Sequence, residues 1–257
     1  SVSALAWTGT SRFNLQLQLL LPSMLMLLWL TLAPQAVFAM DLVYFYASQP
    51  GKPTLDEGEG GGNPFASALV DLLGRESLTF DAFRADMVTL TLRKSDGFQH
   101  PEVVPVSSPG SWPLLPKPAS ERRVALVMVY SDYSAFDVAQ SLAGARRDAQ
   151  RVGAALVKAG FDVQVSLDPD RAKLALDLRS FSDLSHEAEV AVLYTTGHGT
   201  EVHGSVYLLP GDFPVAQGAA ALKERAVRLT TLAAALRAKK TNMVFYAGCR
   251  DVPFGSP

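Results

Sequence analysis

Two side chains that could form a nucleophilic pair, His198 and Cys249, each follow an apolar run of the sequence. His198 follows residues 190–195 within a Gly-His-Gly turn, and Cys249, the only cysteine of the chain, follows residues 243–247. A neighbouring imidazole converts a thiol into a thiolate that attacks carbonyl carbon. The pair therefore predicts thiolate chemistry assisted by an imidazole.

Glycines flank the histidine on both sides and also precede the cysteine. Gly197 and Gly199 let the backbone turn tightly around His198 and leave space for a substrate chain. We expect backbone N–H groups at Gly199 and Gly248 to bind the oxyanion of a tetrahedral intermediate. Each signal alone has a structural alternative, because a lone buried cysteine usually behaves as a small hydrophobe. Their joint placement favours catalysis.

The region from residue 122 onward alternates between short apolar runs and amphipathic stretches, which predicts a parallel α/β sheet. The carboxyl ends of parallel strands meet at one edge, where the loops form a site. His198 and Cys249 both follow such ends. We expect strands at 124–130, 161–167, 190–195 and 243–247, a short strand or hairpin at 205–209, and helices at 142–159, 169–181 and 230–239, with Asp168 as the N-cap of the second helix.

The preceding region has a different composition. Apolar and aromatic residues at 42–47 predict a strand, and an acidic, glycine-rich loop at 51–64 precedes helices at 65–73 and 80–92. Six prolines between residues 100 and 118 indicate a linker, where we place the main boundary. The expected parts are an N-terminal leader or anchor at 1–39, a segment at 41–104, a proline-rich linker at 105–121 and a catalytic region at 122–257.

Composition excludes several classes of protein. The chain has 257 residues, 48% of them hydrophobic, which is typical of a globular enzyme. A net charge of −2 without a Lys/Arg-rich run gives no reason to expect nucleic acid. No histidine has a partner at metal-ligand spacing, so we expect no metal site. A flavodoxin-like small-molecule binder is the weakest alternative, because the sequence contains no glycine-rich phosphate loop.

Residues 1–39 carry one charge, Arg12, ahead of an apolar stretch at 19–32 and a Val-x-Ala site at 37–39. This pattern is typical of a secretory signal peptide. We therefore expect export to a periplasmic or extracellular location, with a hydrophobic membrane anchor or a non-native leader as the alternatives. Any membrane contact is expected only through this segment.

The segments around these residues resemble the caspase-like peptidases, specifically the metacaspase and prokaryotic caspase-homologue group. The resemblance covers residues 122–257 and includes the Gly-His-Gly turn, Cys-Arg-Asp-x-Pro-Phe, and the His-to-Cys interval of about 50 residues. It implies a three-layer α/β sandwich, with a mostly parallel sheet between helices. It also implies a cysteine endopeptidase that cleaves proteins or peptides through an acyl-enzyme, with Cys249 as nucleophile and His198 as base.

One position departs from the family's pattern. The acidic residue expected two positions before the cysteine is Ala247 here, which puts a preference for Arg or Lys before the scissile bond in doubt. Asp148 matches the family's other acidic position and could supply one substrate-binding carboxylate. A solvated helix charge beside Arg147 or Arg151 is the alternative interpretation. This loss also motivates a second functional hypothesis, a catalytically silent binding or regulatory module.

Residues 41–104 resemble the part of the same family that normally follows the cysteine. A circularly permuted domain, a truncated tandem arrangement and a misassembled reading frame would each give this order, and we favour a rearranged or fragmentary sequence. In a rearranged chain, the strand at 42–47 could add beside the strand at 243–247. No cofactor is expected; calcium binding by Asp56, Glu57 and Glu59, as in some metacaspases, is less favoured than a solvated loop.

Overall fold

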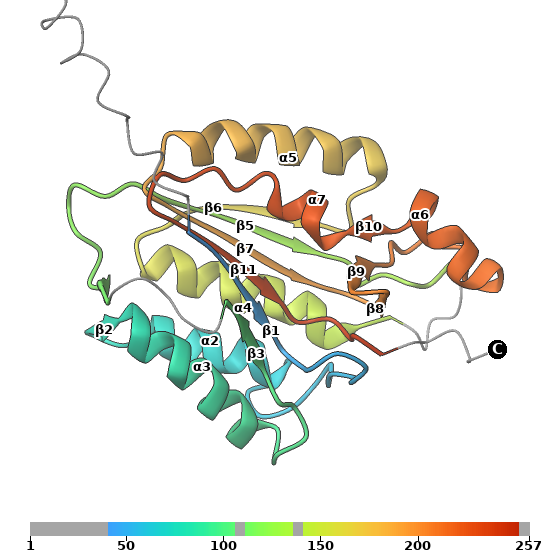
Figure 1. Cartoon of the computed structure of the whole chain (residues 1–257), viewed down its shortest axis with the longest axis horizontal. Coiled ribbons are helices and arrows are strands. Elements are labelled where there is room, and N and C mark those ends of the chain that lie inside the picture. The colour runs from blue at the N-terminus through green and yellow to red at the C-terminus, as the bar shows by residue number, and fades with distance from the viewer. Residues whose placement is uncertain (1–40, 106–110, 136–140, 252–257) are drawn as a thin grey trace, which may run out of the picture. The chain divides into compact units, whose positions relative to one another are not determined.

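The computed structural model describes residues 41–105, 111–135 and 141–251, so the N-terminal leader prediction at 1–39 lies outside the described residues. Met40–Pro257 form one compact unit. Its centre is a six-stranded sheet in the order β3-β1-β11-β7-β5-β6 (Figure 1). Five strands are parallel and β3 is antiparallel to β1. The strands are β1 (Asp41–Tyr46), β3 (Glu102–Val104), β5 (Arg123–Val129), β6 (Asp162–Leu167), β7 (Val190–Thr196) and β11 (Thr241–Tyr246).

Helices cover both faces of this sheet, which confirms the predicted three-layer α/β sandwich. On one face lie α2 (Pro64–Leu73), α3 (Phe80–Lys94) and α4 (Ala143–Lys158), and on the other lie α5 (Arg171–His186) and α7 (Leu229–Ala233) (Figure 1). The sequence explains where α2 begins. Asn63 is the N-cap, because its Oδ1 accepts the N–H of Phe65 at 2.8 Å, and Pro64 occupies the first turn.

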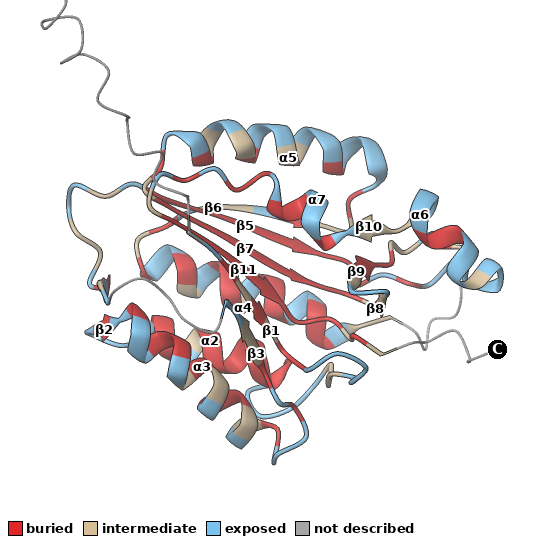
Figure 2. Ribbon diagram, viewed as in Figure 1, coloured by how far each residue is buried: buried red, intermediate tan, exposed pale blue. Residues whose placement is uncertain are grey.

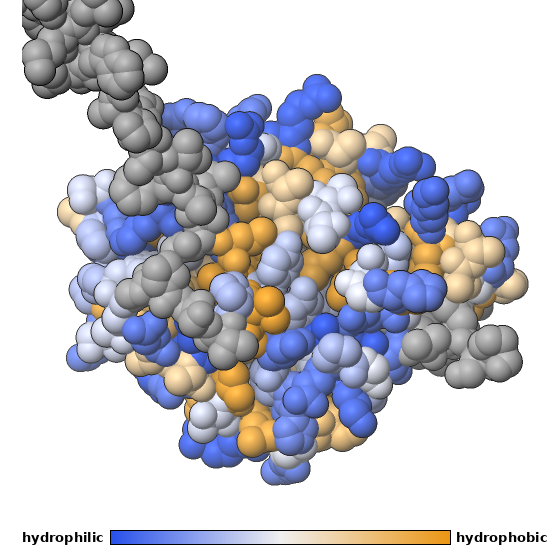
Figure 3. Space-filling model, viewed as in Figure 1, coloured by the Kyte–Doolittle hydropathy of each residue, from blue (hydrophilic) through white to orange (hydrophobic). Residues whose placement is uncertain are grey.

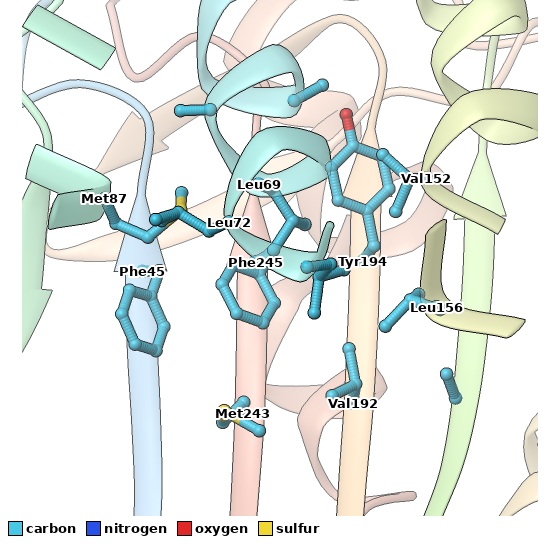
Figure 4. Packing of buried hydrophobic residues seen from close by; sticks show 14 of the residues in the cluster. Phe45, Leu69, Leu72, Met87, Val152, Leu156, Val192, Tyr194, Met243 and Phe245 are labelled. Atoms are coloured by element: carbon cyan, nitrogen blue, oxygen red, sulfur yellow. The ribbon is translucent and has the colours of Figure 1, made fainter. Parts of the chain in front are cut away.

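The central strands are buried on both faces, so alternate residues enter different cores. In β5, Ala125, Val127 and Val129 join the core beneath α2, α3 and α4, while the intervening residues join the core beneath α5 and α7. Figure 2 shows the buried residues concentrated along the strands and the inward faces of the helices. In the first core, Phe45 of β1 stacks on Phe245 of β11 with centroids 4.6 Å apart (Figure 4). The visible outer face is largely hydrophilic, with smaller hydrophobic patches (Figure 3).

Smaller elements surround the central sheet. A three-stranded sheet extends the region after His198 in the order β10-β9-β8, which confirms a short hairpin there. Its members are β8 (Gly199–Val202), β9 (Ser205–Leu208) and β10 (Val227–Arg228), and the 3-10 helix η2 (Val215–Ala221) and α6 (Leu222–Arg225) lie between β9 and β10.

The proline-rich segment contributes secondary structure of its own. Within it, β4 (Pro113–Leu115) pairs with β2 (Leu78–Thr79), and Leu114 and Leu115 are buried. The residues before and after this segment build one sheet, because β1 pairs with β11 in parallel from Asp41↔Thr241 to Tyr46↔Tyr246. The N-terminal strand therefore lies beside the strand that precedes Cys249.

Two local predictions are wrong. The helix expected at 230–239 is only the five-residue α7, and directly after it the Ser185 hydroxyl of α5 donates to the carbonyl of Ala235 and accepts the N–H of Arg237. Asp168 is not an N-cap: Asp170 caps α5 by accepting the N–H of Lys173 at 2.7 Å. Asp168 instead has a positive φ of 48° and accepts the N–H groups of Ser131 and Asp132.

None of the helices among the described residues is long and apolar enough to cross a membrane.

Candidate active site

The strands that carry His198 and Cys249 are direct neighbours in the sheet. β7 and β11 pair in parallel up to Thr195↔Tyr246, and the N–H of Ala247 continues the ladder to the carbonyl of Thr195 at 2.9 Å. Both strands therefore end at the same edge of the sheet. The two glycine turns, which are the turn at residues 197–199 after β7 and the turn at residues 248–249 after β11, lie side by side there. This placement is the one that the apolar runs predict.

The turn around His198 is fixed by a buried tyrosine. The N–H of His198 donates to the Tyr133 hydroxyl at 2.8 Å, and that hydroxyl donates to the carbonyl of Leu209 at 2.8 Å. The two rings meet edge to face with centroids 4.4 Å apart. Burial raises the pKa of Tyr133, so its phenol keeps the proton that this chain of hydrogen bonds requires. Tyr133 thus orients the half-buried imidazole of His198 through the backbone hydrogen bond and the ring contact.

The two turns approach too closely for any side chain larger than hydrogen. Gly197 has a φ of 151°, and a Cβ at Gly199 would lie 1.9 Å from the Tyr246 hydroxyl and 3.1 Å from the carbonyl oxygen of Cys249. A Cβ at Gly248 would lie 2.9 Å from the carbonyl oxygen of Gly197. The histidine turn and the cysteine turn therefore lie against each other. The predicted role of Gly199 and Gly248 in oxyanion binding stays a prediction.

The sulfur of Cys249 contacts a residue from the N-terminal segment, Thr54. The N–H of Thr54 donates to Sγ at 3.3 Å, and the Thr54 hydroxyl lies 3.5 Å from the same sulfur. The hydroxyl also donates to the carbonyl of Ala247 at 3.1 Å. Cys249 itself is half-buried. No local pattern in the sequence identifies Thr54, because it lies 195 positions from the cysteine that it contacts.

Arg250, the residue after the cysteine, joins the turn to the N-terminal segment. Its guanidinium donates to Glu102 of β3 and Glu201 of β8, both at 2.6 Å, and lies over the ring of Tyr46 at 4.1 Å. Its backbone N–H donates to the carbonyl of Lys52 at 3.1 Å. Arg250 therefore forms two ion pairs next to Cys249.

The acidic loop after β1 is bound to α4. The Asp56 carboxylate accepts the N–H groups of Gly144 and Ala145, at 2.9 and 2.8 Å, and so caps a helix from 88 residues away. An anion at this position is stabilised by the helix dipole. Glu57 pairs with Arg147, and Glu59 pairs with Lys94 at 2.8 Å. The three acids predicted as a solvated loop or a calcium site each have a protein partner.

Asp148 lies in the interior, with none of its surface exposed. It accepts the N–H of Asn63 at 2.8 Å and pairs with Arg151 at 2.9 Å. Burial raises its pKa to about 7, against the opposing effects of these two donors. The interpretation as a solvated charge is wrong, although its pairing with Arg151 is confirmed. Contact with a substrate stays a prediction, and it would require the backbone at Gly62 and Asn63 to move.

Within the described residues, no group of three or more His, Cys, Asp or Glu side chains converges as a metal site would require. His100, His186 and His203 are all exposed, and they lie on three separate segments: the turn after α3, the end of α5 and the β8–β9 hairpin.

Comparison with known proteins identifies the family. The family model of the caspase domain matches residues 122–255, which is more than half of the 257 residues. The match begins just before β5 and includes both glycine turns. No curated protein matches the chain. On the evidence of its matched domain and its helix-covered parallel sheet, the chain belongs to the caspase-domain family of peptidases.

Proposed function

We propose that this chain is a cysteine-type endopeptidase in which Cys249 is the nucleophile and His198 is the general base. The observation that supports this most directly is the close approach of the two glycine turns at the ends of β7 and β11. Because the turns lie against each other, a peptide carbonyl can meet the thiol and the imidazole from one side. The family membership supports the same reaction class.

The reaction proceeds through an acyl-enzyme. The imidazole of His198 takes the thiol proton, and the sulfur of Cys249 forms a bond to the scissile carbonyl carbon. Backbone N–H groups near Gly199 and Gly248 bind the oxyanion of the tetrahedral intermediate. The imidazolium then protonates the leaving amine as the C–N bond breaks. Water, deprotonated by the imidazole, hydrolyses the thioester, and the thiol regains its proton.

Two residues assist this pair by orienting it. Tyr133 fixes the backbone of His198 and packs against the ring, while Thr54 places an N–H and a hydroxyl on the sulfur of Cys249. These contacts restrict the two side chains before substrate arrives, which lowers the entropic cost of reaching the reactive geometry. The substrate is a protein or peptide, the reaction needs no cofactor, and the expected site of action is outside the cytoplasm.

Replacement of the nucleophile tests the proposal. We expect Cys249→Ala and His198→Ala to abolish cleavage of an internally quenched peptide library while the circular-dichroism spectrum stays unchanged. His186→Ala is the matched control, because this histidine is exposed at the end of α5 and should leave cleavage unaltered.

Retained cleavage in Cys249→Ala would rule out the thiol as nucleophile. A wild-type chain that cleaves no peptide, and whose thiol is not alkylated by iodoacetamide at neutral pH, would instead favour the silent binding module, because an inactive buried thiol reacts slowly.

A further inference from the structure

The hydroxyl of Tyr246, the last residue of β11, lies against the cysteine turn. It donates to the carbonyl oxygen of Cys249 at 2.9 Å, and the tyrosine has no exposed surface. Burial raises the pKa of Tyr246 well above its usual value, so the phenol keeps the proton that this hydrogen bond requires. The strand that leads into the cysteine turn therefore also supplies a permanent hydrogen-bond donor to it.

This hydrogen bond fixes the peptide unit that follows the cysteine. The C=O of Cys249 and the N–H of Arg250 belong to one planar trans peptide unit, in which they point in opposite directions. The C=O accepts from Tyr246, and the N–H donates to the carbonyl of Lys52 at 3.1 Å. Because the unit is held from both sides, it cannot rotate without losing both hydrogen bonds.

The backbone ahead of the turn is held as well. The carbonyl of Ala247 accepts hydrogen bonds from the hydroxyl of Thr54 and from Nδ2 of Asn63, both at 3.1 Å. Gln99 in turn holds Asn63, because its Nε2 donates to Asn63 Oδ1 at 3.3 Å. Since the backbone is bonded both before and after Cys249, the direction in which its Cα–Cβ bond projects the sulfur is restricted too.

The same hydroxyl lies between the two glycine turns. A Cβ atom at Gly199 or at Gly248 would come too close to the Tyr246 hydroxyl for either side chain to fit. Glycine at these two positions therefore leaves the space that the hydroxyl occupies. Because Gly199 directly follows His198, Tyr246 lies at the junction of the histidine turn and the cysteine turn.

We propose that Tyr246 is a positioning residue for the nucleophile. Through the carbonyl of Cys249, it holds the backbone in the orientation from which the sulfur meets the imidazole and the scissile carbonyl. Without the hydroxyl, the peptide unit after Cys249 is released on one side, and a smaller fraction of chains has the sulfur in the reactive geometry. The inference rests on the proposed endopeptidase function, because the reactivity of Cys249 reports the positioning.

Tyr246→Phe tests this role, because it removes the hydroxyl and keeps the buried ring. We expect kcat for an internally quenched peptide to fall about fivefold, the usual factor for one hydrogen bond, while KM stays unchanged. A purely structural role would shift the urea-unfolding curve without changing kcat per folded chain. Tyr194→Phe, on the neighbouring strand β7, is the matched control: this tyrosine is equally buried, and within the described residues its hydroxyl has no hydrogen-bond partner.

Alkylation of Cys249 by iodoacetamide gives a second measurement that does not depend on turnover. We expect it to slow about fivefold in Tyr246→Phe and to keep the wild-type rate in Tyr194→Phe. Slower alkylation in Tyr246→Phe alone supports the positioning role even if the wild-type chain cleaves nothing. Unchanged kcat and unchanged alkylation in a folded Tyr246→Phe chain overturn this role and leave the endopeptidase proposal intact. A wild-type chain that neither cleaves a peptide nor is alkylated overturns both.

Discussion

Two walls of different origin meet at Cys249. One wall consists of the turns after β7 and β11, which lie at neighbouring strand ends and touch through their own backbones. The other consists of residues 47–56 from the N-terminal segment, which reach the cysteine turn through hydrogen bonds such as Thr54 to Sγ and Arg250 to Lys52. The first wall contains the proposed reacting groups, His198 and Cys249, and the second encloses the sulfur of Cys249.

The two walls therefore have different roles: the first contains the residues proposed to react, and the second positions them. The proposed reacting residues follow the ends of two parallel strands, β7 and β11, that pair through a regular backbone ladder. The enclosing residues are placed by a few specific side-chain contacts, of which Arg250 makes the most. Loss of one such contact should weaken the second wall without removing the reacting groups.

Arg250→Met should have the largest effect on stability. It removes the cation from two carboxylates, and because the arginine side chain is only 6% exposed, we expect a loss of about 3 kcal/mol in the free energy of unfolding by urea. The matched control is Arg225→Met, whose ion pair with Asp212 is solvent-exposed and should contribute less than about 1 kcal/mol. If the free energy of unfolding falls equally in the two variants, the ion pairs of Arg250 do not hold the second wall against the cysteine turn.

Thr54→Val should affect the thiol more than the fold. The variant keeps the shape of the side chain and the backbone N–H but removes the hydroxyl, so we expect alkylation of Cys249 by iodoacetamide to slow about fivefold, as for one hydrogen bond. Thr54→Ser should restore the wild-type rate. Thr89→Val, on the exposed face of α3, serves as the control. An unchanged rate in Thr54→Val would mean that the N-terminal wall encloses the sulfur without orienting it.

Asp148→Asn should change the pH dependence of stability. Burial raises the folded-state pKa of Asp148 to about 7, so between about pH 4 and pH 7 the folded chain binds a proton that the unfolded chain has lost. Stability of the wild-type chain therefore falls as the pH rises through this window, and the asparagine variant lacks this component. Urea unfolding of both chains at pH 4.5 and pH 7 measures the difference in slope.

Asp177→Asn provides a control of opposite sign. Burial alone would raise the pKa of Asp177, but hydrogen bonds from Lys173 and Ser166 lower it overall. The stability from this carboxylate is present above the unfolded-state pKa and is lost as the pH falls through the folded-state value. Parallel slopes for Asp148→Asn and the wild-type chain would contradict a buried, proton-binding carboxylate at Asp148.

The sequence predicts the first wall well and the second poorly. Apolar runs, glycines and a single cysteine are local signals, and they placed His198 and Cys249 at neighbouring strand ends. Thr54, Gln99 and Tyr133 carry no such signal, because each matters only through contacts that distant parts of the chain create. The helix predicted at 230–239 stops short for the same reason, since the residues after Ala233 bond to the Ser185 side chain of α5, an interaction that helix periodicity does not encode.

Because β1 pairs with β11, the central sheet can form fully only after β11 has been synthesised. The paired residues are 200 positions apart, as in Phe45↔Phe245. At a synthesis rate of about 5–20 residues per second, β1 emerges from the ribosome roughly 10–40 s before its partner strand. During that interval its Val43 and Phe45 face no neighbouring β11, and Thr54 has no sulfur to contact. The segment that encloses the thiol is therefore already synthesised when Cys249 emerges.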